Sequence, residues 1–413
     1  MPSSPTANRL DDDMSMPDLS FSIRAVDAYH LVIPDKTYWN TFNETNRTTS
    51  PRFLLKPGWR TVYARRLESA IVRVTLSDGT VGWGEATEPI CPEVVCRLAT
   101  ELFAPLAASM EFDDPPALWN FCYDLQRGRG HSTGYQLLAM AALDVAVWDA
   151  LGRRHDMPVC GLLSDSPRRL VPVYLSGIRR ATLPQRIALL REMSDGGLRG
   201  AKIFVDADTE TTLREVSALR EGVPGLRDLM ADALWSYTDF RQAAEAKRRL
   251  ADYRVKWLEC PLLPEDLDGH ARLAAEAGVS IALGESFFTS LQAAPWVQAR
   301  ALQILQPDIC RTGFSDGRRQ QQLAEAAGIA VTAHMGSGSP IVQAAALQFD
   351  AALRNELLAE HQFDLGNPLP DVFRSAWIYR DGAMQVPAAP GLGLTVDEPA
   401  LREHCRGVDT WSR

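Results

Sequence analysis

Alternating hydrophobic and polar positions define the first part of the chain. Residues 21–33, FSIRAVDAYHLVI, alternate in the way expected of a half-buried strand. Residues 68–86, ESAIVRVTLSDGTVGWGEA, predict two more strands around the turn Ser77-Asp78-Gly79. Strands joined by so short a turn pair antiparallel, so the pattern predicts an antiparallel sheet at the start of the chain.

A polar segment rich in aromatic residues separates these strands. Residues 37–59, TYWNTFNETNRTTSPRFLLKPGW, are too many for a tight connection between two strands. Loops of this length are commonly lids or disordered segments, and we interpret this one as a lid over a binding site.

The pattern becomes helical from about residue 92. The run YQLLAMAALDVAVWDALGRRH, residues 135–155, has apolar residues on nearly every side. A helix of this kind must be surrounded by protein, so we expect it to pack between two domains.

Short apolar strands then alternate with polar helices. The strands are VPVYLSG, beginning at Val171, followed by GAKIFVD, LMADALW, VKWLECP, SIALGE, ALQILQPD and GIAVTAH. Six strand-and-helix units follow the first strand and return about every 26 to 30 residues, which favours a closed (β/α) barrel. An open doubly wound sheet is the alternative, but no glycine-rich dinucleotide loop supports it.

The amino-acid composition and charge exclude several classes of protein. The chain has 413 residues, of which 46% are hydrophobic and 23% charged, as in ordinary globular proteins. Its net charge of -9 is spread along the chain and argues against nucleic acid or an anionic membrane as a partner. The seven cysteines show no paired framework, and the first 20 residues lack the features of a secretory signal. We expect a cytoplasmic enzyme with reduced thiols.

Charged residues follow the apolar strands of the repeat. The strands end on Lys202, Asp232, Glu259, Glu285, Asp308 and His334, and a later segment supplies Glu360. Reacting groups of barrel enzymes sit at these strand ends. Any one of Asp232, Glu259 and Glu285 taken alone is more commonly a helix cap or a surface ion pair. Three carboxylates from successive strands predict a site for one Mg²⁺ ion.

These motifs resemble the enolase superfamily. LMADALW, KWLECP and ALGES are similar to its three metal-ligand strands, and QPDICRTG and VTAHMGSG resemble the aspartate and histidine strands of its mandelate racemase subgroup. The C-terminal VPAAPGLGLTVDE is also similar to the tail of these proteins. The resemblance implies that a base removes the proton next to a substrate carboxylate, and that magnesium stabilises the resulting enediolate.

The resemblance also implies the domain organisation. It predicts an α/β fold with a modified (β/α)7β-type barrel over residues 170–370 and an α+β capping domain over residues 21–165. Residues 371–413 are expected to return to the capping domain, and residues 1–20 to form a mobile arm. Members of this family are often homo-oligomers, and we expect the same here.

Roles for four residues follow from the resemblance and from their chemistry. His334 is the expected acid or base, because the ordinary pKa of histidine allows proton transfer near neutral pH. Asp308 would orient its ring, and Lys202 would attract the substrate carboxylate. Glu360 would donate a hydrogen bond to the developing enolate, which requires a raised pKa. A buried structural histidine and an exposed helical glutamate are the alternative readings of His334 and Glu360.

One departure from the family pattern discriminates between reactions. Many members carry a second lysine two positions after the first, but Lys202 is followed by Phe204 on the same face of the strand. Racemisation needs a proton-transfer group on each face of the carbon, whereas one histidine can serve for loss of water. Leu234, Cys260 and Arg311 replace other common polar residues without touching the three predicted ligands.

The sequence therefore predicts an acid-sugar dehydratase that converts an aldonate or aldarate to a 2-keto-3-deoxy acid. Lid residues are expected to contact the substrate hydroxyls, with Tyr38, Asn40, Asn46, Arg47 and Arg52 as candidates. An epimerase, a racemase or a cycloisomerase of the same superfamily is the first alternative. A non-catalytic sugar-acid binding protein is the second.

Overall fold

The computed structural model describes residues 17–33, 50–56, 61–205, 207–362, 367–375 and 377–413. Tyr38, Asn40, Asn46 and Arg47 of the predicted lid lie outside the described residues, as does most of the predicted N-terminal arm. Within the described residues, no helix has the length and apolar character needed to cross a membrane.

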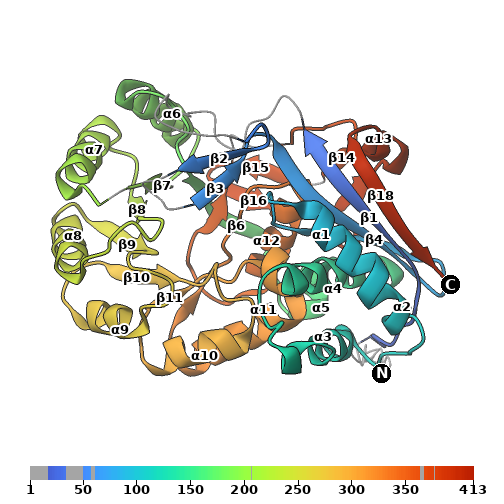
Figure 1. Cartoon of the computed structure of the whole chain (residues 1–413). Helices are drawn as coiled ribbons and strands as arrows, with labels where there is room; N and C mark the ends of the chain where they lie inside the picture. Colours follow the sequence, from blue (N-terminus) through green and yellow to red (C-terminus); the bar gives the residue numbers. More distant parts are fainter. Residues whose placement is uncertain (1–16, 34–49, 57–60, 206, 363–366, 376) are drawn as a thin grey trace, which may run out of the picture.

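An antiparallel sheet forms the core of the first domain. Its four strands lie in the order β18-β1-β4-β5 (Figure 1). The bounds are Cys405–Ser412 for β18, Ile23–Ile33 for β1, Leu67–Leu76 for β4 and Val81–Ala86 for β5. β18 comes from the C-terminal end of the chain and pairs with β1 from Ala25 to Leu31. The last segment of the chain thus completes the sheet that the first segment begins.

The first domain also contains helices, some of which pack against this sheet and others against neighbouring helices. They are α1 (Pro92–Arg97), α2 (Ala104–Ala107), α3 (Pro115–Asp124), α4 (Tyr135–Arg154) and α5 (Val159–Leu163), with a π-helical turn over Leu98–Phe103 and a 3₁₀ turn over Arg127–Arg129. Every residue of α4 from Gln136 to Gly152 is buried. This confirms that the apolar run is a helix surrounded by protein.

Glycines in β5 allow α4 to lie directly against the sheet. A Cβ atom added to Gly84 would stand 2.0 Å from the carbonyl oxygen of Ala142, and one added to Gly82 would stand 2.0 Å from that of Ala146. Both neighbours are helix backbone atoms, which cannot move aside as a flexible side chain can. The close packing of β5 on α4 therefore depends on these two glycines.

We expect Gly84→Ala to destabilise the protein by about 3 kcal/mol, because the added methyl group forces the sheet and α4 apart. Urea unfolding followed by circular dichroism measures the loss. Gly407→Ala in β18 is the matched control, since nothing lies within 4 Å of the added methyl group. Equal unfolding midpoints for the two variants would contradict this account of the packing.

The second domain is a closed barrel of parallel strands. The strands are β6 (Leu170–Ser176), β7 (Gly200–Phe204), β8 (Asp228–Asp232), β9 (Val255–Glu259), β10 (Ser280–Leu283), β11 (Ile304–Leu305), β12 (Ala330–Val331) and β13 (Ala359–His361). Their order follows the sequence from β6 to β12, and β13 pairs parallel with β6. This order excludes the open doubly wound sheet.

A helix follows each barrel strand except the last. The helices are α6 (Leu183–Asp195), α7 (Thr209–Gly222), α8 (Phe240–Asp252), α9 (Leu267–Ala275), α10 (Ser290–Gln298), α11 (Ile309–Ala326) and α12 (Pro340–Ala352). Figure 1 shows α6 to α10 around the outside of the barrel and α11 and α12 toward the capping domain. The arrangement confirms the predicted (β/α)7β type.

Two smaller features lie beside the barrel. Part of the predicted lid is not a loop, because β2 (Phe53–Lys56) and β3 (Thr61–Ala64) pair as an antiparallel hairpin. The prediction was wrong there because the apolar and β-branched residues of FLL and TVY stabilise each other across the two strands. The C-terminal segment contributes β14 (Phe373–Ser375), β15 (Ile378–Arg380), β16 (Ala383–Gln385), β17 (Leu394–Val396) and α13 (Glu398–Glu403).

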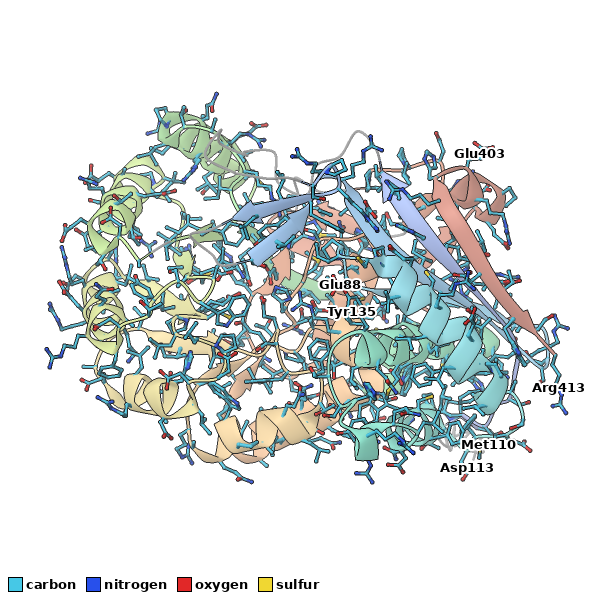
Figure 2. The ribbon with its side chains drawn as sticks, in the orientation of Figure 1. Glu88, Met110, Asp113, Tyr135, Glu403 and Arg413 are labelled. Atoms are coloured by element: carbon cyan, nitrogen blue, oxygen red, sulfur yellow. The ribbon has the colours of Figure 1, made fainter. Side chains whose placement is uncertain are left out.

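Buried hydrogen bonds join the two domains. Asp144 of α4 accepts from the backbone N–H of Ser315 in α11 at 3.0 Å and from its hydroxyl at 2.5 Å. Glu85 of β5 accepts from the N–H of Ser339, the N-cap of α12, at 2.9 Å. Within the capping domain itself, Tyr135, near Glu88 in Figure 2, donates to the carbonyl oxygen of Ile90 at 2.9 Å. Of these hydrogen bonds, only those of Asp144 and Glu85 cross between the domains. These contacts hold the capping domain over one end of the barrel.

Candidate functional site

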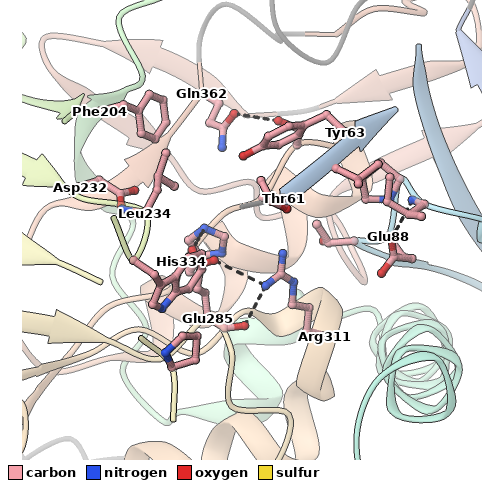
Figure 3. Close-up of a pocket in the computed structure, with 18 of the residues that line it drawn as sticks. Thr61, Tyr63, Glu88, Phe204, Asp232, Leu234, Glu285, Arg311, His334 and Gln362 are labelled. Atoms are coloured by element: carbon pink, nitrogen blue, oxygen red, sulfur yellow. Dashed lines mark hydrogen bonds and ion pairs between the residues drawn. The ribbon is translucent and has the colours of Figure 1, made fainter. Parts of the chain in front are cut away.

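A pocket of about 510 Å³ lies between the two domains. The barrel contributes residues at or just beyond the carboxyl ends of its strands, among them Lys202, Asp232, Glu285, His334 and Glu360. Thr61 and Tyr63 of the hairpin and Glu88 after β5 close the pocket from the capping side (Figure 3). The fold therefore gathers strand-end residues that are far apart in the sequence into one cavity.

Lys202 lies among three carboxylates inside the barrel. Its ammonium group pairs with Glu259, with Glu360 at 3.1 Å and with Asp232 at 3.4 Å. Burial favours the neutral amine, but Glu259 and Glu360 outweigh it and raise the pKa of Lys202 well above its ordinary value. Lys202 is therefore a fixed positive charge, engaged with carboxylates of the protein itself.

The three predicted metal ligands differ in their surroundings. Glu259 is buried, and its second oxygen accepts from Trp257 Nε1 at 3.0 Å and from Gln306 Nε2 at 2.9 Å. Asp232 and Glu285 line the pocket. Burial and the charge of Glu259 raise the pKa of Asp232 well above its ordinary value. The positive charge of Lys202 lowers this pKa but offsets the two raising effects only in part.

His334 lies between two carboxylates. Its Nδ1 is 2.9 Å from Asp308 Oδ2, and its Nε2 is 2.8 Å from Glu285 Oε2. Burial disfavours the imidazolium, but Glu285 and Asp308 outweigh it and raise the pKa of His334 well above its ordinary value. In turn His334, together with Arg311, lowers the pKa of Glu285 to about 2 despite its burial.

Asp308 holds the ring of His334 from the side away from Glu285. It is the N-cap of α11, and its Oδ1 accepts from the N–H of Cys310 at 2.9 Å. Because Oδ1 is held by the helix terminus, Oδ2 faces Nδ1 of the histidine. Nδ1 is thereby engaged by Asp308, so a proton could be exchanged with another molecule only at Nε2, which contacts Glu285 in this structure.

Glu360 lies in β13, not on a helix, and it is buried. It accepts from Ser176 Oγ at 2.5 Å and from the N–H of Met335 at 3.0 Å. The expectation of a raised pKa is wrong for this arrangement. Burial raises the pKa, but Lys202 and His334 outweigh burial and lower it below its ordinary value. The helical, exposed alternative for Glu360 is also wrong.

The donor set is compatible with a hard divalent cation, although its spacing in this structure is not that of a metal site. Within the described residues, no three acidic, cysteine or histidine side chains are close enough together to hold a metal ion. Lys202 and His334 instead supply the positive charge beside Asp232, Glu259 and Glu285. Carboxylate oxygens from three adjacent strands are nevertheless the ligands that Mg²⁺ prefers.

The turn after β8 fixes the direction of Asp232. Leu234 and Trp235 have φ values of 48° and 54°, a left-handed conformation that is costly for residues with a Cβ atom. Leu234 donates its N–H to Asp232 Oδ1 at 3.0 Å, and Trp235 donates to the carbonyl oxygen of Cys260 at 2.6 Å. These contacts hold the strained turn in place, and Leu234 itself lines the pocket.

Of the predicted substrate-binding residues, the structure describes only Arg52. Its guanidinium pairs with Glu68 at 2.6 Å and with Glu93 at 2.7 Å, and it is not among the residues that line the pocket. Phe204 does line the pocket together with Lys202.

Several pocket residues escaped the sequence analysis. They are Thr61, Tyr63, Glu88, Arg179, Ser337 and Gln362. Arg179 and Gln362 follow barrel strands within three residues, so a search beyond the last apolar position of each strand could have found them.

Comparison with known proteins places the chain among relatives over nearly its whole length. Residues 50–164 match the model described as mandelate racemase / muconate lactonizing enzyme, N-terminal domain, and residues 185–400 match the model described as enolase C-terminal domain-like. D-galactarolactone cycloisomerase of Agrobacterium fabrum is 30% identical over 353 residues, which cover 82% of this chain and 91% of that protein.

One further relative and one solved structure are similar to this chain over most of its length. D-galactonate dehydratase of Ralstonia nicotianae is 28% identical over 82% of this chain and 92% of its own length. A crystal structure of an enolase superfamily member from Agrobacterium tumefaciens superposes with a TM-score of 0.85 at 28% identity, covering 93% of this chain and 98% of that one.

Proposed function

Since the chain belongs to the enolase superfamily, in its mandelate racemase and muconate lactonizing enzyme family, we propose that it removes the proton next to the carboxylate of a sugar acid and then eliminates water. The product would be a 2-keto-3-deoxy acid. The observation that carries this proposal is the His334–Asp308 pair, which shares one pocket with the Asp232 and Glu285 carboxylates. Position 204 of the same pocket holds a phenylalanine instead of a second lysine. Relatives named as sugar-acid dehydratases support the substrate class.

His334 would perform both proton transfers. Its contact with Glu285 raises the pKa of His334 in this structure, so His334 would act as a base once Glu285 no longer pairs with it. In that neutral form, with the remaining proton on Nδ1 facing Asp308, Nε2 would accept the proton from C2 of the substrate. The electron pair of that C–H bond moves first into the carboxylate group and then forms the C2–C3 double bond as the hydroxyl leaves from C3. His334 returns its proton to this hydroxyl, so water departs, and the resulting enol tautomerises to the keto acid.

The other residues would bind and orient. Asp232, Glu259 and Glu285 would hold a magnesium ion, which supplies positive charge that stabilises the substrate after proton loss. Asp308 holds the histidine ring in the required tautomer. Lys202 keeps Glu259 and Glu360 in place through its ion pairs. Phe204 excludes water from the face of the substrate where a second base would stand and cannot itself transfer a proton.

A cycloisomerase is the second candidate, favoured by the similarity to D-galactarolactone cycloisomerase. An isomerisation of this kind can begin with the same abstraction of a proton next to a carboxylate and also requires only one base. The two candidates therefore share His334 and differ in whether water is lost. An epimerase is less well supported, because Phe204 leaves one face without a lysine.

A substrate screen in deuterated water tests the proposal. Aldonates, aldarates and their lactones are incubated with the protein and magnesium, and 2-keto-3-deoxy product and solvent deuterium in product and substrate are read by NMR. We expect keto-deoxy product with deuterium at C3 from at least one acid. A ring-isomerised product would replace this proposal with the cycloisomerase. Binding without product or exchange would identify a sugar-acid binding protein.

A further inference from the structure

Positive charge is distributed unevenly around the pocket. Besides His334, the described residues that line it include three cationic side chains, namely Lys202, Arg179 and Arg311. Lys202 pairs with Glu259, Asp232 and Glu360, and Arg311 lies 3.7 Å from both Glu285 and Asp308. Both of these cations therefore lie among the carboxylates of the proton-transfer site.

Arg179 lies on the other side of the barrel mouth. It follows β6, the first barrel strand, whereas Asp232, Glu259 and Glu285 follow the third, fourth and fifth strands. In a closed ring of eight strands, the first strand stands opposite the fifth. Figure 3 shows Gln362, the hydrogen-bond partner of Arg179, across the pocket from Glu285.

The guanidinium of Arg179 is held in a fixed position. Its Nη2 donates to Gln362 Oε1 at 2.8 Å, and the amide nitrogen of Gln362 donates to the carbonyl oxygen of Met335. Ser337 Oγ lies 3.3 Å from the same Gln362 oxygen. Because Met335 engages the amide nitrogen, the amide oxygen must face Arg179. Both side chains are at least nine-tenths buried, at 7% and 6% exposed.

A buried arginine in a ligand pocket is suited to one chemical group in particular. The guanidinium is always charged and presents its N–H groups as a planar fork, which matches the two oxygens of a carboxylate. A substrate whose first carboxylate lies beside Asp232 and Glu285, through a cation, would extend its far end across the mouth toward Arg179.

We propose that Arg179 binds a second carboxylate, at the far end of the substrate, so that the pocket selects aldarates or their monolactones over aldonates. This inference rests on the proposed function and adds the substrate class to it. Gln362 acts as a positioning residue, which aims the guanidinium without touching the reacting atoms.

The test compares matched pairs of aldarate and aldonate with the same configuration. We expect wild-type kcat/KM to be higher for the aldarate of the preferred pair. Arg179→Gln should lower kcat/KM for the aldarate by ~10- to 100-fold, the loss expected when hydrogen bonds to a charged group are removed, and change it for the aldonate by less than about threefold. Arg179→Lys should recover part of the loss. Arg380→Gln, at an exposed position, is the matched control.

A second variant covers the case in which Arg179→Gln does not fold. Gln362→Glu keeps the size of the side chain but places a carboxylate against Arg179, so it should lower aldarate turnover selectively. Equal losses for both acids in either variant, or a wild-type preference for aldonates, would overturn the inference and leave the dehydratase intact. If no acid is turned over, the proposed function fails, and calorimetric binding of the two acids to wild type and Arg179→Gln decides the inference separately.

Discussion

Replacement of His334 by asparagine is expected to lower kcat by about 10³-fold or more and to abolish deuterium exchange next to the carboxylate, because general acid–base groups contribute on the order of 10²- to 10⁴-fold. The imidazole is held by Asp308 at 2.9 Å, and no other histidine among the described residues lines the pocket. Asparagine occupies similar space and can still hydrogen-bond to Asp308, but it cannot transfer a proton. Substrate binding should therefore persist while both chemical readouts are lost.

The measurement is a rate assay with the best acid from the screen, together with exchange by NMR in deuterated water. His131→Asn, at an exposed position, is the matched control and should retain wild-type rates. If His334→Asn kept rapid exchange and lost only product, another residue would remove the proton and His334 would act only on the leaving hydroxyl. Unchanged rates would refute a catalytic role for His334.

Asp232→Asn is expected to abolish turnover and to weaken Mg²⁺ binding by at least 10-fold, since it removes a charged oxygen from a site with only three predicted carboxylate ligands. The effect can be detected without activity. A cation bound at 100 times its Kd stabilises the folded state by about 2.7 kcal/mol. Wild-type protein stripped with a chelator should therefore gain thermal stability when Mg²⁺ is added, and Asp232→Asn should gain much less.

The electrostatics of the site also predict how Asp232→Asn changes the stability of the protein after it has been stripped with a chelator. Without added positive charge, burial and Glu259 raise the pKa of Asp232, so its charged form is disfavoured in the folded protein. Asp232→Asn removes that penalty, and the stripped variant should be at least as stable as the stripped wild type. Asp228→Asn, at the other end of the same strand, is a suitable control for the Mg²⁺ response. A full response to Mg²⁺ in Asp232→Asn would place the cation elsewhere.

The amino-acid sequence was sufficient to predict the fold class. The alternation of Ile23–Ile33, the apolar run of α4 and the returning strand-and-helix units are local patterns, and burial of apolar side chains enforces them wherever the chain lies. Strand ends also identified Lys202, Asp232 and His334 as pocket residues, because all parallel strands of a barrel present their carboxyl ends on the same side.

The tertiary structure decided which side chains and strands are paired, and in which direction the pKa values of the buried groups are shifted. Whether Glu360 has a raised or lowered pKa depends on Lys202 and His334, which lie 158 and 26 positions away in the chain and approach it only when the barrel closes. The pairing of β2 with β3 likewise could not be read from the polar sequence around these strands. Arg179 and Gln362 came together only because β13 pairs with β6 and closes the ring. Electrostatic interactions depend on distances in space. The amino-acid sequence therefore identified the charged residues, but it could not show how their charges balance one another.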